Sequence, residues 1–348
     1  MLSYFTGKII NGILVMAGVI VVVFVLFQGF GDPARMVLGQ TADLSTQQNI
    51  RRELNLDLPK WRQFVLYVND VSPIAIHDRQ EIKQKQLRGI FIGGKYKLGF
   101  KVPYLRRSYQ SKKEVWDILT DALPGTIILA FAAMFIAVMA GIPLGILAAV
   151  KKNTWMDTSS IFFSVLGISA PSFFTGIAMA YVFGFVLSHY TGLSMTGSLF
   201  DTDPFAGRQM QLQNLILPAV TLGIRPLAII TQLTRSSMLD VLNQDYIRTA
   251  YAKGLSKSMV VWKHALRNAL NPVITAITGW FAELLAGAFF VEYIFGWKGI
   301  GKVTVEALEN LDFPVVMGSV LISSFFFISI NLLADLLYAI IDPRIRNT

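Results

Sequence analysis

The chain has 348 residues, of which 53% are hydrophobic and 15% are charged, and its formal net charge is +9. Soluble globular domains carry about 25% charged residues, so this composition and a mean hydropathy of +0.52 exclude an ordinary soluble domain. The absence of cysteine excludes structural disulfides and thiolate metal sites. The basic residues flank apolar runs and form no folded basic domain, which argues against nucleic-acid binding.

Six apolar runs are long enough to cross a bilayer, which requires about 20 mostly apolar residues. Three of them carry no charge, namely 9–31, 122–150 and 158–188. Three carry ionisable residues, namely 212–234 with Arg225, 273–295 with Glu283 and Glu292, and 314–341 with Asp335. We therefore predict an all-α integral membrane fold with six transmembrane helices. The first run is longer than the apolar part of a signal peptide and no cleavage site follows it, so we expect a retained anchor.

The predicted layout is an N-terminal transmembrane helix at 1–31, an extracytoplasmic segment at 32–121 and a five-helix core at 122–348. Basic residues precede the first run, follow the second and fourth, and follow the sixth. With six spans these positions share one side, which the positive-inside rule assigns to the cytoplasm together with both termini. The segment at 32–121 is too long for that rule to apply. Its Gly93–Gly94 pair, with lysines nearby, predicts a loop or hairpin.

The second run carries a small residue at every fourth position, at Ala133, Ala137, Gly141 and Gly145. This spacing places small side chains on one helix face, where a neighbouring backbone can approach closely. Pro143 in the same run predicts a bend. Close helix packing is a sufficient explanation of the pattern.

Ionisable residues inside a span are costly and are usually functional or paired. Two explanations stay open for Arg225, Glu283 and Asp335. They line the passage of a transporter, or they form a buried pair between helices, such as Arg225 with Glu283. We favour the structural pair. Glu292 is expected near a membrane interface, where exposure to water lowers its cost.

The polar stretch at 238–271 lies between the fourth and fifth runs and predicts a helix, a break at Gly254 and a second helix. Ser256 is expected to cap the second helix, and Pro272 to open the fifth span. Such a two-armed loop can dock into a groove of another protein or pack on its own bundle. Helical spacing predicts one apolar stripe, formed by Leu239, Leu242, Tyr246, Ala250, Met259, Trp262 or Lys263, and Leu266.

This loop resembles the EAA loop of ABC importer permeases, in the variant of the dipeptide/oligopeptide/nickel group. The similar residues are YIRTAYAKGL at 246–255 and KHALRNALNP at 263–272. Similar motifs lie along most of the chain, at 32–35, 53–60, 141–149, 169–174, 295–302 and 335–346. Two features depart from the family pattern. Arg248, Thr249 and Ala250 stand where the general pattern has an acidic residue and two alanines, and the stretch at 70–109 looks inserted.

The resemblance implies the type I ABC importer (MetI-like) permease fold in the cytoplasmic (inner) membrane, with a small extracytoplasmic subdomain. It implies a transport subunit without its own ATPase site, catalytic residues, cofactor or metal, because ATP and magnesium would be bound by partners. Those partners are a second homologous permease, two cytoplasmic ATPase subunits and an extracytoplasmic substrate-binding protein. The expected substrate is a dipeptide or oligopeptide, with nickel or another small solute as the alternative. The residues implied in coupling to the ATPase are Tyr246, Arg248, Ala250, Ala252, Lys253, Gly254 and Leu255.

Two other functional classes receive less support from the residues. A stand-alone secondary transporter is favoured by broken helices paired in two halves, and the chain has no clear internal repeat. An intramembrane enzyme needs a nucleophile with its base, and no GxSxG motif is present. Gly296, Gly301 and Lys302 fit the spacing of a phosphate-binding loop, but Val303 stands where Ser or Thr is required. We therefore predict a tight re-entrant turn there.

Overall fold

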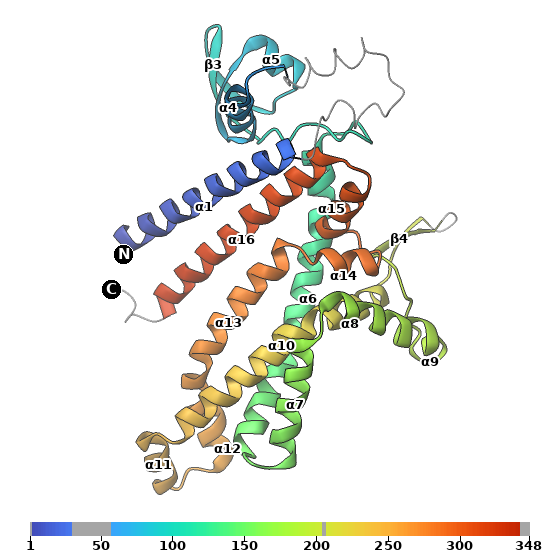
Figure 1. Ribbon diagram of the computed structural model, residues 1–348. Coiled ribbons are helices and arrows are strands. Elements are labelled where there is room, and N and C mark those ends of the chain that lie inside the picture. The colour runs from blue at the N-terminus through green and yellow to red at the C-terminus, as the bar shows by residue number, and fades with distance from the viewer. Residues whose placement is uncertain (1, 30–56, 204–206, 342–348) are drawn as a thin grey trace. The chain divides into compact units, whose positions relative to one another are not determined.

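The computed structural model describes residues 2–29, 57–203 and 207–341, which are mainly helical (Figure 1). The chain forms two compact units. We call residues 1–6, 123–302 and 326–348 the first unit, and residues 7–122 and 303–325 the second unit. The motif at 32–35, the start of the motif at 53–60 and the end of the motif at 335–346 lie outside the described residues.

Five described helices are long and apolar enough to cross a membrane. They are α1 (Leu2–Gly29), α6 (Val115–Val150), α10 (Gln213–Leu242), α13 (Leu266–Ala286, continuing a helix from Lys257) and α16 (Phe313–Ile341). A sixth span results if one bent pair is counted as a single crossing. Within the described residues, the prediction of six spans is confirmed on that count.

The bent pair consists of α7 (Trp155–Ser169) followed by α8 (Ser172–Met179) and the π-helix η1 (Ala180–Val186), and its halves meet at 105°. Pro171 explains the break. A residue before proline is driven out of the helical region, and Ala170 is extended with φ −75° and ψ 126°. Proline also lacks the N–H that would continue the helix. The uncharged run at 158–188 is therefore a sharply bent helix pair, the geometry of a broken span or a re-entrant loop.

In the first unit, α10 packs against α7, α8 and α13. The predicted small-residue stripe of α6 is confirmed, because Ala133 and Ala137 are completely buried. A Cβ placed on Gly141 would lie 3.0 Å from the carbonyl oxygen of Leu227, and one on Gly145 would lie 2.6 Å from that of Thr231. Only glycine therefore allows the backbones of α6 and α10 to approach as they do.

The second unit contains a small subdomain in which α4 (Lys60–Val71) lies against α1. The ring of Phe24 is 5.1 Å from that of Phe64. A three-stranded antiparallel sheet follows, with strand order β1-β3-β2 and a short helix α5 (Arg79–Gln84) after the first strand. The strands are β1 (Ile74–Asp78), β2 (Gly89–Gly93) and β3 (Tyr96–Lys101). Of the predicted loop or hairpin at Gly93–Gly94, the structure has the hairpin, as the turn between β2 and β3.

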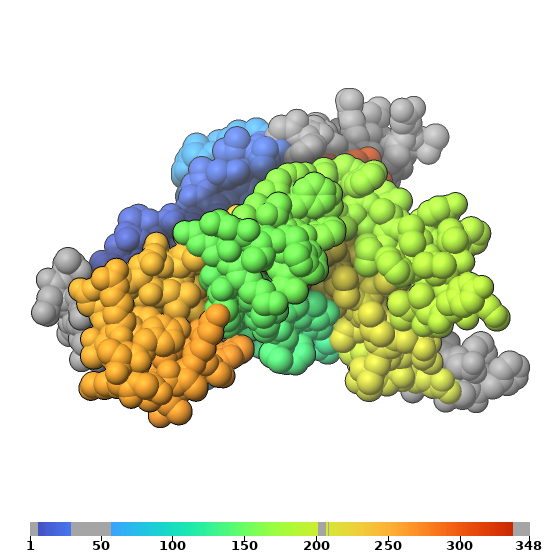
Figure 2. All heavy atoms as spheres, turned by 90° about the horizontal axis from the view of Figure 1, so that it is seen from below, coloured from blue at the N-terminus to red at the C-terminus, as the bar shows by residue number. Residues whose placement is uncertain are grey.

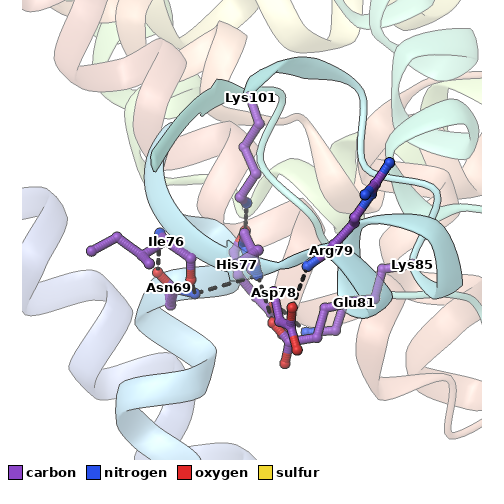
Figure 3. A network of polar contacts seen from close by, with 9 residues as sticks. Asn69, Ile76, His77, Asp78, Arg79, Glu81, Lys85 and Lys101 are labelled. Atoms are coloured by element: carbon purple, nitrogen blue, oxygen red, sulfur yellow. Dashed lines mark hydrogen bonds and ion pairs between the residues drawn. The ribbon is translucent and has the colours of Figure 1, made fainter. Parts of the chain in front are cut away.

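One face of this sheet is covered by a network of polar contacts (Figure 3). The side chain of Asn69 donates to the carbonyl of Ile76 at 2.8 Å, and Nδ1 of the buried His77 lies 3.1 Å from a carboxylate oxygen of Glu81. The ammonium group of Lys101, which is also buried, donates to the backbone carbonyl of Asp70. The opposite face is apolar and exposed, and it carries Ile74, Ile76, Ile90, Ile92, Leu98 and Phe100.

The remaining elements are short. In the first unit they are α9 (Ser188–Thr191), the hairpin of β4 (Phe200–Asp203) and β5 (Gly207–Met210), and α14 (Phe289–Ile294). The helix α15 (Ile300–Glu309) begins in the first unit. The prediction that Pro272 opens a span is wrong, because the helical segment already begins at Lys257 and Pro272 lies inside α13.

Candidate functional site

The polar stretch between α10 and α13 forms a bent structure that we call the elbow, residues 245–265. It consists of α11 (Asp245–Ala252), a break at residues 253–255, α12 (Lys257–Met259) and the π-helix η2 (Val260–Ala265). Gln244 is extended (φ −73°, ψ 149°), so α11 starts as a new helix and does not continue α10. The predicted order of helix, break and helix is confirmed.

The break is a Schellman motif, the common helix end in which a left-handed glycine allows two backbone hydrogen bonds to close the last turn. Gly254 has φ +79°. Its N–H donates to the carbonyl of Tyr251 at 2.9 Å, and the N–H of Leu255 donates to the carbonyl of Ala250 at 3.3 Å. Leu255 also packs against the cluster that contains Ala250, which is the apolar contact typical of this motif. Gly254 therefore sets the direction in which the second arm leaves.

The second arm starts as predicted at Ser256, whose hydroxyl accepts a hydrogen bond from the N–H of Met259 at 3.4 Å. The predicted apolar positions Met259 and Trp262 are 45% and 55% exposed, so this part of the stripe is wrong. The wider turn of the π-helix changes the phase of the buried face. The side chains it buries are Val260, Val261 and Ala265.

The buried face of α11 is also displaced by one residue from the predicted stripe. Leu239 and Leu242 are half-buried and Ala250 is buried, as expected, but Tyr246 is 41% exposed. Its hydroxyl accepts a hydrogen bond from the amide of Asn268 at 2.8 Å. Ile247 is buried in its place, with 1% exposed. The break between α10 and α11 explains the displacement, because helical periodicity does not carry through an extended residue.

Within the first unit, one apolar cluster packs the elbow against three long helices. Ile247 and Ala250 of α11 pack with Ala149 at the end of α6, Met238 of α10 and Ala269 of α13. In the space-filling view the orange atoms of the elbow form a bulge next to the green atoms that follow α6 (Figure 2). A displacement of α11 would therefore act on all three helices at once.

An ion pair that the sequence reasoning missed lies in the same unit. The guanidinium of Arg235 on α10 donates to the carboxylate of Asp157 on α7 at 2.9 Å, and Asp157 also accepts from the N–H of Asn153 at 3.0 Å. The side chain of Asp157 is 4% exposed. In the sequence Arg235 is one of the basic residues that flank the fourth apolar run. The signal that could have found the pair is a lone aspartate at the start of an uncharged run.

The predicted exposure of Glu292 is wrong, because the residue is completely buried. Its carboxylate accepts hydrogen bonds from the hydroxyl of Thr126 at 2.8 Å, from the N–H of Gly301 at 2.7 Å and from the N–H of Lys302 at 3.2 Å. The last two N–H groups belong to the first turn of α15, where a carboxylate is favoured by unpaired donors and by the helix dipole. Glu292 therefore ties α14 to α15 and α6.

This arrangement explains the glycines between α14 and α15. A Cβ on Gly299 or Gly301 would lie 2.3 Å or 2.9 Å from the carboxylate of Glu292, and Gly296 has φ +64°. The predicted tight turn is confirmed. The donors that a phosphate would need at Gly301 and Lys302 are already bonded to Glu292, and a helix precedes the turn where a phosphate-binding loop has a strand.

Two family models match the chain. Residues 141–347 match the inner membrane component of binding-protein-dependent transport systems, and residues 1–84 match the N-terminal part of the corresponding membrane component. The chain belongs to this family.

Individual relatives agree with this assignment. The permease is 34% identical to the dipeptide transport system permease protein DppB of Alkalihalophilus pseudofirmus, over 99% of this chain and 100% of the relative. It is 35% identical to DppB of Escherichia coli K12, over 91% of this chain and 90% of the relative. It is also 35% identical to the glutathione transport system permease protein GsiC of the same strain, over 99% of each.

A solved structure supports the fold. The permease superposes on a chain of the MetNI methionine ABC transporter in an inward-facing conformation with a TM-score of 0.50 and 16% identity. The match covers 65% of this chain and 97% of that chain. The prediction of a type I, MetI-like importer fold is confirmed.

Exposure separates the predicted coupling residues of the permease into two groups. Ala250 is buried and Leu255 half-buried, so both belong to the attachment of the elbow. Five are exposed and available to a partner, namely Tyr246, Arg248, Ala252, Lys253 and Gly254. Arg248 lies 3.5 Å from the carboxylate of Asp245, an exposed pair of a kind that contributes about 0–1 kcal/mol. Whether these residues meet an ATPase stays a prediction.

The favoured pair of Arg225 with Glu283 is absent from the described part of the chain, where no ion pair joins them. The guanidinium of Arg225 instead lies 5.6 Å from the ring centroid of Trp280. Both charged side chains are exposed within this single chain. Asp335 is half-buried in α16.

Proposed function

We propose that this permease is a membrane-spanning subunit of an ATP-driven importer of dipeptides or oligopeptides, and that its elbow receives the mechanical input from an ATPase partner. The peptide substrate is supported by the relatives named for dipeptide and glutathione transport. The coupling role is supported by the geometry of the elbow, which exposes one face and anchors the other to three long helices.

The proposed complex contains a second homologous permease, two cytoplasmic ATPase subunits that bind ATP and magnesium, and an extracytoplasmic substrate-binding protein. Both termini and the elbow lie in the cytoplasm, as the distribution of basic residues favours. Closure of the ATPase pair on ATP displaces α11. Because Ile247 and Ala250 share one cluster with Ala149, Met238 and Ala269, the displacement reaches α6, α10 and α13 together. The bundle then exchanges between inward and outward access.

The observation that carries this proposal is the exposed Schellman break at Gly254, which joins two arms that each bury one face against the long helices. The chain contains no cysteine, so a single cysteine at Lys253 provides a unique label. In oriented membranes a membrane-impermeant maleimide should label this cysteine from the cytoplasmic side, and excess ATPase subunit should protect it. Labelling from the outer face would contradict the coupling role.

Transport itself is tested with the complete importer in proteoliposomes. Uptake of a labelled dipeptide should require ATP and should persist when an uncoupler removes the ion gradient. Uptake that survives ATP depletion and collapses with the uncoupler would instead favour a secondary transporter. Uptake of nickel in place of peptide would favour the alternative substrate.

A further inference from the structure

A cavity of about 170 Å³ lies inside the first unit, where α7, α8, α10, α13 and α14 meet. Its walls include Thr221, Arg225, Trp280 and Glu283. Sites for drug-sized ligands have volumes of about 300–1,000 Å³, so this cavity suits one short solute. It thus combines a small volume with two side chains of opposite charge.

The two charged side chains form no ion pair with each other within the described residues, and both are exposed and so accessible to a ligand. Arg225 stands on α10, with its guanidinium 5.6 Å from the ring centroid of Trp280, and Glu283 lies three residues after Trp280 on α13. Among the residues that the structure describes, neither forms an ion pair, although each lies in or near the end of an apolar span. An ionised group at such a depth is costly unless water, a partner or a ligand compensates it.

A second observation points to a missing hydrogen-bond partner in the same cavity. Thr221 is 3% exposed, and its hydroxyl oxygen has no hydrogen-bond partner within the described chain. Thr221 lies four residues before Arg225, so the two side chains share one face of α10. A buried hydroxyl without a partner is destabilising, and a polar solute in the cavity would supply the missing hydrogen bond.

We propose that this cavity is a subsite for the two charged ends of a short zwitterionic peptide on its way through the permease. The planar guanidinium of Arg225 pairs with the peptide carboxylate in the fork geometry that suits it. Glu283 pairs with the peptide ammonium group, and the hydroxyl of Thr221 bonds to the peptide carboxylate or amide. This assignment rests on the proposed function and names the chemistry its substrate must have.

The test uses the complete reconstituted importer at saturating substrate-binding protein, with a free dipeptide and the same dipeptide amidated at its C-terminus. Wild-type protein should transport the free peptide at least about tenfold faster than the amide. Arg225→Gln should slow the free peptide about tenfold and bring the ratio of the two rates close to one. Glu283→Gln should do the same for the free peptide against its N-acetylated form.

The hydroxyl of Thr221 has a matched control on the same helix. Thr234 is also buried with an unpartnered hydroxyl, and it does not line the cavity. Thr221→Val should slow uptake several-fold, while Thr234→Val should leave it unchanged. Equal effects of the two substitutions would overturn the role of Thr221.

The outcomes separate this inference from the proposed function. Normal uptake of free peptide by Arg225→Gln and Glu283→Gln would overturn the subsite and leave a peptide importer in place. A wild-type complex that transports no peptide would contradict the proposed function itself. If Arg225→Gln fails to assemble, the wild-type comparison still decides, because equal rates for free and amidated peptide would refute the pairing with Arg225.

Discussion

Gly254 offers the sharpest test of the elbow, because its substitution changes backbone strain without creating a steric clash. It has φ +79°, and a Cβ added there would meet no atom within 4 Å. A non-glycine residue in the left-handed region costs about 1–2 kcal/mol, and a β-branched residue is the least tolerated there. Gly254→Val should therefore reduce the equilibrium constant for the observed bend about 5–30-fold. Gly254→Asn should lose less, because asparagine tolerates this conformation.

The assay is ATP-dependent peptide uptake by the reconstituted complex, together with ATP hydrolysis in the same vesicles. Gly254→Val should lower uptake about 5–30-fold while the amount of inserted permease stays constant. Gly192 provides the matched control, since it has φ +66° and equally open surroundings but lies outside the elbow. Gly192→Val should keep uptake within about twofold of wild type. Normal transport by Gly254→Val, or an equal loss in both variants, would refute the proposed role of the bend.

Three further predictions concern stability. Glu292→Leu leaves the N–H groups of Gly301 and Lys302 unpaired and should lower the free energy of unfolding in detergent by about 2–4 kcal/mol. Glu292→Gln keeps an acceptor and should lower it less, and equal losses would contradict the hydrogen-bonding role. In a double-mutant cycle, Asp157→Asn and Arg235→Gln should show a coupling of about 1–3 kcal/mol, and strict additivity would contradict the ion pair. Burial lowers the pKa of Lys101 from 10.5 to about 8, against the opposing charge of Asp70. The unfolded chain then binds more protons between these values, so stability should rise from pH 8 to 10.5 in wild type. Thermal unfolding of Lys101→Met should lack this component, and an identical pH profile would refute it.

The sequence predicts those features that depend on local pattern alone. Long apolar runs give the spans, because crossing a bilayer requires only length and low polarity. The Ala133–Gly145 stripe and the break at Gly254 are also predictable from local sequence. Small side chains permit close packing at their own positions, and a left-handed glycine ends a helix at its own position.

Features that depend on contacts across the chain escape such patterns. In the sequence Glu292 is a charge near the end of an apolar run. Its partner Thr126 is 166 residues away in sequence, and Gly301 is separated from it by a turn. Helical periodicity predicts a buried Tyr246 only if the helix continues through Gln244, and Gln244 is extended. The expected pair of Arg225 with Glu283 depends only on their opposite charges, whereas the spacing of the two helices decides whether the side chains meet.

The bend at Pro171 has a consequence for solvation. The first N–H groups of a helix have no acceptor in an earlier turn, and α8 begins anew at Ser172, in the middle of an uncharged run. Lipid hydrocarbon contains no hydrogen-bond acceptor for these N–H groups. An irregular backbone inside a bilayer therefore persists only where it contacts protein or water. Ser172 also lines the cavity that contains Arg225 and Glu283. The start of α8 at the kink therefore needs packed protein or cavity water beside it, which a lipid-facing position would not provide.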